Sequence, residues 1–91
     1  METRIALIGI IVEDPDSADK INHILHEYRE CIVGRMGIPY HKRCVSIISI
    51  VVDAPNDVIS ALSGKLGMLP HVNTKTVYSK TPPIDENEYV R

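Results

Sequence analysis

The chain has 91 residues, 44% of them hydrophobic and 24% charged, with a formal net charge of −2. This length suits one domain with a small core, and the charge excludes the broad basic surface of a nucleic-acid-binding module. The longest apolar run, Ile5–Val12, is much shorter than the about 20 residues that span a bilayer. It also lacks the features of a secretory signal. We therefore expect a cytoplasmic protein without membrane association, whose two cysteines are reduced.

The spacing of apolar residues predicts strand, helix, strand, strand, helix and strand in chain order. We expect strands at Arg4–Glu13, Ile38–Lys42, Cys44–Asp53 and Val72–Ser79, and helices at Asp16–Ile32 and Pro55–Met68. The first helix begins where Asp14 can act as N-cap and Pro15 fits the first helical position. We expect it to stop near Gly34, with an irregular connection through Gly37 and Pro39.

The first and third predicted strands are apolar on both faces. In the first strand, Ala6, Ile8, Ile10 and Val12 alternate with Ile5, Leu7, Gly9 and Ile11. Neither set is polar, which is typical of a central strand buried on both sides. Gly9 permits a close backbone approach from a helix or a partner chain. Gly64, inside the second helix, costs about 1 kcal/mol relative to alanine, and we expect a close helix–sheet contact to explain it.

This order of elements predicts an α+β, ferredoxin-like βαββαβ sandwich. Its antiparallel sheet has strand order 4-1-3-2, with two helices on one face. The other face is then an apolar patch larger than monomers usually tolerate. We therefore expect a homo-oligomer, a dimer or tetramer built through this face, with side-by-side pairing of edge strands as the alternative. Residues 1–79 form the domain, and residues 80–91 a C-terminal tail or oligomerisation arm.

Histidines and cysteines supply the candidate metal ligands. His23 and His26 are three residues apart on the first predicted helix, so both imidazoles project from the same side. His41 and Cys44 flank the turn before the third strand, and a further ligand could come from His71, from His23 or His26, or from another subunit. Such residues are usually surface histidines and a small apolar cysteine. We therefore assign no metal site from the sequence. A site formed by His41, Cys44 and His71 is the alternative.

The acidic loop between the first strand and the first helix holds the candidate ligand-binding residues, Glu13, Asp14 and Asp16. In this topology the loop meets a helix N-terminus near a subunit boundary, where backbone amides can bind a small molecule. Helix capping is the simpler role for these side chains. No nucleophile–base grouping is visible, so we expect a protein that is not an enzyme. The sequence identifies no cofactor.

Three segments resemble a known family: A-L-S-G-K-L-G at Ala61–Gly67, I-I-V-E-D at Ile10–Asp14 and R-M-G-I-P-Y at Arg35–Tyr40. Over residues 3–79 the chain resembles small bacterial proteins described as regulators of the iron-only hydrogenase system. These are similar to ACT domains and to the C-terminal domain of the nickel-responsive ribbon-helix-helix repressor. The resemblance implies a ferredoxin-like, ACT-like fold, an oligomer and a regulatory role.

The resemblance does not extend to nickel or to DNA. The H-x-H motif of the nickel repressor has no counterpart on the third predicted strand, because Val45–Val52 contains no histidine. No ribbon-helix-helix segment precedes Arg4 in the sequence, so we expect no direct DNA binding by this chain alone.

Taken together, these features favour a small oligomeric regulatory or sensor domain. It would bind a small-molecule effector or a partner protein at a subunit interface. A transition-metal-binding module with His and Cys ligands is the first alternative. A small oligomeric enzyme, with acidic residues and histidines gathered at an interface, is the second.

Overall fold

The structure, a computed structural model, describes residues 2–80. Its elements in chain order are β1 (Arg4–Val12), α1 (Asp16–Glu27), the 3-10 turn η1 (Arg29–Cys31), β2 (Ile32–Tyr40), the 3-10 turn η2 (His41–Arg43), β3 (Val45–Ala54), α2 (Asn56–Gly67) and β4 (Val72–Tyr78). The tail or arm predicted for residues 80–91 lies, apart from Lys80, outside the described residues. No helix among the described residues is long and apolar enough to cross a membrane.

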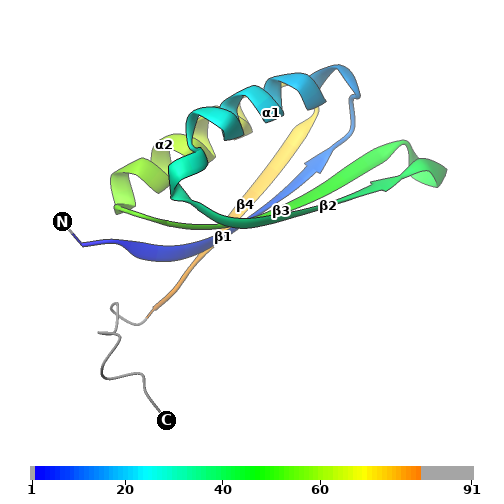
Figure 1. The fold of residues 1–91 in the computed structure, drawn as a ribbon. Coiled ribbons are helices and arrows are strands. Elements are labelled where there is room, and N and C mark those ends of the chain that lie inside the picture. Colours follow the sequence, from blue (N-terminus) through cyan, green and yellow to red (C-terminus); the bar gives the residue numbers. More distant parts are fainter. Residues whose placement is uncertain (1, 81–91) are drawn as a thin grey trace, which may run out of the picture.

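The four strands form one antiparallel sheet in the order β2-β3-β1-β4, and both helices cover the same face of it (Figure 1). This arrangement confirms the predicted ferredoxin-like α+β fold and its strand order. The two central strands are β1 and β3, as their apolar sequences indicated, and the two edges are β2 and β4.

The core lies between the sheet and the two helices. It is built from Ala6, Ile8, Ile10, Val12, Ile21, Leu25, Ile48, Ile50, Val52, Ala54, Ile59, Leu62, Leu66 and Val72. On β1 and β3 these are alternate residues, because successive side chains of a strand point to opposite faces. Only one face of each central strand is buried in the single chain, so the prediction of burial on both faces is not met by this chain alone.

The boundary between α1 and β2 differs most from the prediction. The helix ends at Glu27, and the predicted connection through Gly34, Gly37 and Pro39 is part of β2. The apolar spacing misled the prediction because Tyr28 and Ile32 both pack against the core, but from a turn and from a strand. Glycine and proline are tolerated in β2 because it is an edge strand. The other predicted boundaries are right to within one or two residues.

Gly64 does not mark a close helix–sheet contact, so that prediction is wrong. A Cβ added at Gly64 would meet no heavy atom of residues 2–80 within 4 Å, and the residue is exposed on α2. The close approach lies instead at Gly67, the last residue of α2, where a Cβ would meet the Thr74 hydroxyl at 3.3 Å. Gly64 therefore weakens the helix without a packing reason inside the chain.

Replacing Gly64 by alanine is expected to raise the free energy of unfolding by about 1 kcal/mol, because alanine restricts the unfolded backbone and favours the helix. Urea unfolding followed by far-UV circular dichroism, at one fixed protein concentration, measures the change. Gly67→Ala is the matched control in the same helix and should give no such gain, since its Cβ crowds Thr74. Equal stabilities for Gly64→Ala and the parent chain would contradict the prediction.

Candidate functional site

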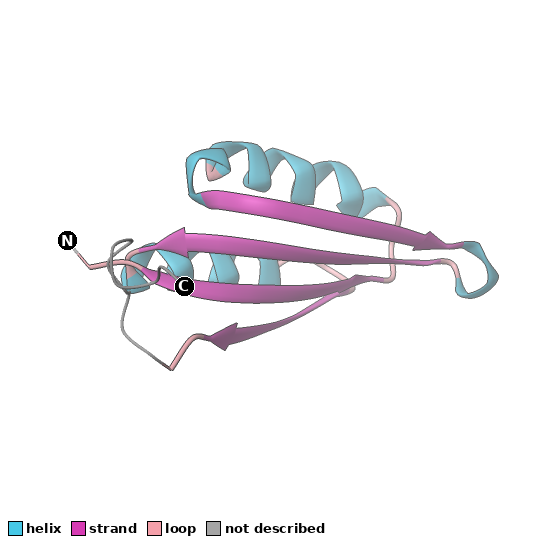
Figure 2. Ribbon diagram, turned by 60° about the horizontal axis from the view of Figure 1, so that its bottom comes forward, coloured by secondary structure: helices cyan, strands magenta, loops and turns pink. Residues whose placement is uncertain are grey.

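The face of the sheet opposite the helices, here called the open face, exposes many large apolar side chains. Figure 2 shows its four strands with both helices behind them. Its apolar side chains are Ile5, Leu7, Ile11, Met36, Ile38, Tyr40, Val45, Ile47, Val51 and Val77. Ile11 and Ile47, at its centre, are 45% and 43% exposed. Monomeric proteins rarely expose so continuous an apolar surface unless it serves as an interaction site.

Strand register arranges the open face in rows that run across the sheet. The isoleucine row is Ile38, Ile47, Ile11 and Asn73; the glycine row is Met36, Ser49, Gly9 and Lys75; the leucine row is Gly34, Val51, Leu7 and Val77. The middle of the glycine row is low, because Gly9 and Ser49 are small residues on neighbouring central strands. This low middle of the glycine row, at Gly9 and Ser49 beside the isoleucine row, is here called the trough.

A hollow of about 410 Å³ lies over this part of the sheet. Its lining includes Gly9, Ile11, Ile47 and Lys75. Lys75 is the charged member of the three rows, all of which lie within residues 2–80. The hollow is thus an apolar depression with one cationic group at the β4 edge. Such a surface suits an apolar partner better than a highly charged one.

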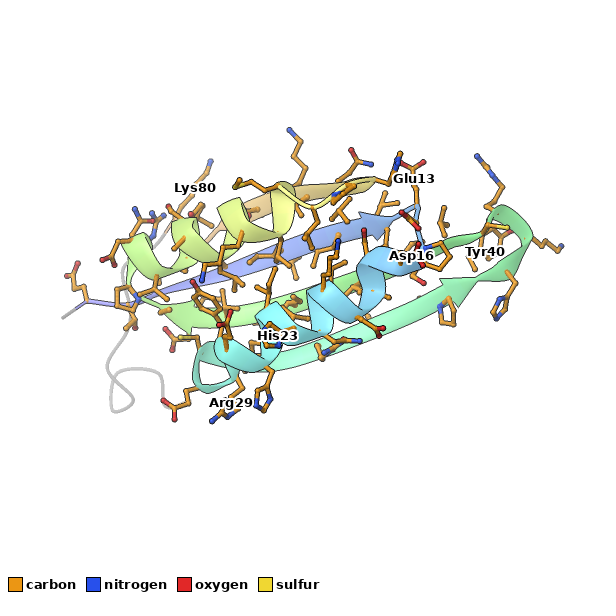
Figure 3. All side chains as sticks on the ribbon, turned by 90° about the horizontal axis from the view of Figure 1, so that it is seen from above. Glu13, Asp16, His23, Arg29, Tyr40 and Lys80 are labelled. Atoms are coloured by element: carbon orange, nitrogen blue, oxygen red, sulfur yellow. The ribbon has the colours of Figure 1, made fainter. Side chains whose placement is uncertain are left out.

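The acidic loop, here called the acidic corner, joins the end of β1 to the start of α1, and Figure 3 labels Glu13 and Asp16 at this end of the molecule. Asn73 donates a hydrogen bond to Glu13 Oε1 at 3.1 Å. The Asp16 amide donates to Asp14 Oδ1 at 3.0 Å, so the Asp14 carboxylate accepts from the first residue of α1, whose N-cap is Pro15. The corner therefore has two carboxylates engaged within the chain and an exposed Asp16.

Two hydrogen bonds hold this corner against the loop that precedes β4. The buried Ser17 hydroxyl donates to the Pro70 carbonyl oxygen at 2.8 Å. The Glu13 amide donates to the carbonyl oxygen of His71 at 2.9 Å. Because Glu13 follows Ile11 on the same side of the extended chain, the corner adjoins the margin of the open face.

The candidate metal ligands are not gathered in the single chain. His41 belongs to the turn η2, and Cys44 follows it with a left-handed backbone, φ 55°. His71 lies in the loop before β4, also with a positive φ of 58°. Among residues 2–80, no group of three or more His, Cys, Asp or Glu side chains could hold a metal ion. The same holds for His23 and His26 on α1.

Sequence reasoning found the open face but not the trough that crosses it. The trough depends on Gly9 lying beside Ser49, and this pairing follows from the β1–β3 register. The available signal was a glycine in the middle of an otherwise apolar central strand. It marks one position of a hollow, but the neighbour on the next strand is set only by the register.

Comparison with known proteins agrees with this structure. Residues 4–76 match the model of the TM1266-like family, described as "Iron-only hydrogenase system regulator, putative". The solved structure of the uncharacterized protein TM1266 from Thermotoga maritima matches with a TM-score of 0.83 and 38% sequence identity, covering 87% of this chain and 100% of that one. No curated protein matches the chain. The family match spans most of the fold, from the start of β1 into β4, so this chain belongs to the TM1266-like family.

Proposed function

We propose that this chain is a small, non-catalytic regulatory domain that works as a homo-oligomer and belongs to the iron-only hydrogenase system. It would bind a small effector or a partner protein at a subunit interface. The exposed apolar open face carries this proposal. The family description supports the regulatory part.

The open face favours association because the helices cover only the other face of the sheet, which leaves the apolar side chains of the open face exposed. Removing exposed apolar surface from water is favourable, by about 25 cal/mol for each Å². A domain of 91 residues has a small core, so a second subunit would add to the stability of each chain. The two-sided apolar pattern of β1 and β3 is then explained as a sheet buried on one side by helices and on the other by a subunit.

The acidic corner is the place where we expect an effector to reach this interface. Glu13, Asp14 and Asp16 lie next to the margin of the open face, at the N-terminal end of α1. Backbone amides at a helix start favour anionic groups, whereas the carboxylates favour a cationic or amine group. A small molecule that carries both kinds of group would suit this corner.

Native mass spectrometry of tag-free protein, purified without oxygen or chelator, tests the proposal. We expect an oligomer, and additional mass on that oligomer would identify the effector. Alanine replacement of Asp16, which is exposed, should then lower the occupancy of that ligand without changing the subunit number. A monomer at micromolar concentration would contradict the oligomeric part of the proposal.

A further inference from the structure

Gly9 has no explanation among residues 2–80 of its own chain, the part that the structure describes. It lies in the middle of the central strand β1, where glycine is destabilising relative to alanine. Its backbone does not require glycine, since no described glycine has a positive φ. Space does not require it either, because within the described part of the chain an added Cβ would meet only the Lys75 carbonyl oxygen, at an ordinary 4.0 Å. A glycine with free space on an exposed sheet face often marks a close approach by a group outside the described residues.

The surface around Gly9 is complementary to itself. Rows on one face of a strand pair are about 6.8 Å apart, because each residue advances about 3.4 Å. The glycine row forms a trough, and the isoleucine row forms the ridge beside it. A second copy turned by a two-fold axis that runs between these two rows would place each ridge over the trough of the other copy. Such mutual contact, in which residue i meets j and j meets i, is what a two-fold interface requires.

We propose that two copies of this chain pack open face to open face, with Ile11 and Ile47 of each copy seated over Gly9 and Ser49 of the other. Toward the edges the same operation places Ile38 over Met36 and Asn73 over Lys75. At these four positions apolar groups thus meet apolar or small ones, and polar groups meet polar ones. One row further out, the same operation places Leu7 over Glu13 at the end of the footprint. This inference rests on the proposed oligomer and names its geometry.

Charge and area favour a second copy over other occupants. The three rows contain one charged side chain, Lys75 at the edge strand, so two copies meet without burying a charge at the centre. Four strands about 4.8 Å apart and seven residues long give a flat footprint of roughly 450 Å². Two such footprints bury about 900 Å² in total, close to the roughly 1,000 Å² expected of a specific interface. The projecting side chains add further area to this flat estimate. A small molecule in the hollow would leave the outer apolar residues exposed.

Filling the trough is the direct test. Gly9→Val should weaken self-association by about 100-fold or more in dissociation constant, because the added side chain overpacks a symmetric interface twice. Gly37→Val is the matched control: Gly37 lies in the same sheet, faces the helix side, and has the same 4.0 Å clearance. Sedimentation equilibrium measures the association, and far-UV circular dichroism shows that each variant keeps its fold.

A double variant tests the specific pairing of Ile11 with Gly9. Ile11→Ala alone should weaken association by about tenfold, because it removes the ridge. In the Gly9→Val background the same substitution should instead strengthen association, because it makes room for the valine of the other copy. This reversal of sign is expected only where the two residues face each other across the interface.

The outcomes separate this inference from the proposed function. Weaker association of Gly9→Val with unchanged Gly37→Val, together with the sign reversal, supports the open-face dimer. An oligomer that neither variant disturbs overturns the inference but leaves the proposed oligomer standing, through the edge strands instead. A monomeric parent chain overturns both.

Discussion

Replacing Ile8 by alanine is expected to lower the free energy of unfolding by about 3 kcal/mol. The side chain is 0% exposed on β1 and points into the core between the sheet and the helices. Its truncation removes apolar burial and leaves a cavity that the rigid sheet cannot close. A loss of this size is a large fraction of the stability of a small domain. Urea unfolding followed by circular dichroism, at constant protein concentration, measures it.

Ile5→Ala is the matched control for Ile8→Ala. It makes the same chemical change on the same strand, but Ile5 is 46% exposed and lies on the open face, outside the three central rows. Its loss of stability should be under half that of Ile8→Ala. Equal losses at the two positions would mean that the core is not confined to the helix side, and would contradict the assignment of the two faces.

Replacing Ile11 by lysine is expected to abolish self-association in the micromolar range while the chain stays folded. The ammonium group would be buried without a partner in an apolar interface, and each interface would contain two of them. In the single chain the position is 45% exposed, so lysine can extend into water there. We expect the dissociation constant to rise at least about 100-fold, measured by sedimentation equilibrium.

Met68→Lys controls for the added charge. Met68 is 85% exposed at the C-terminal end of α2, on the helix side of the sheet, where a cation is favourable. Its association should equal that of the parent chain. If Ile11→Lys associates as tightly as Met68→Lys, the open face is not the interface. Loss of the circular dichroism signal in Ile11→Lys would instead assign this residue to the stability of the single chain.

Much of the fold was predictable from local patterns. The strands β1 and β3 were evident from uninterrupted apolar runs, and α2 from its regular spacing, because side-chain periodicity is fixed by backbone geometry. The order of elements and the handedness of the crossovers then left few topologies. The apolar character of the open face also followed, since both faces of the central strands are apolar. The candidate site was harder to predict, because Glu13, Asp14 and Asp16 suit helix capping as well as ligand binding.

The sequence by itself determined the element order, the sheet topology and the presence of two apolar sheet faces, because these depend on period and chirality. Only the tertiary structure decided where α1 gives way to β2, since Tyr28 and Ile32 continue the helical apolar spacing but pack against the core from a turn and from a strand. Only the structure separated His41 and Cys44 from a common metal site with His71. It alone placed Gly9 beside Ser49. Strand register joins residues forty positions apart, and no local pattern encodes that pairing.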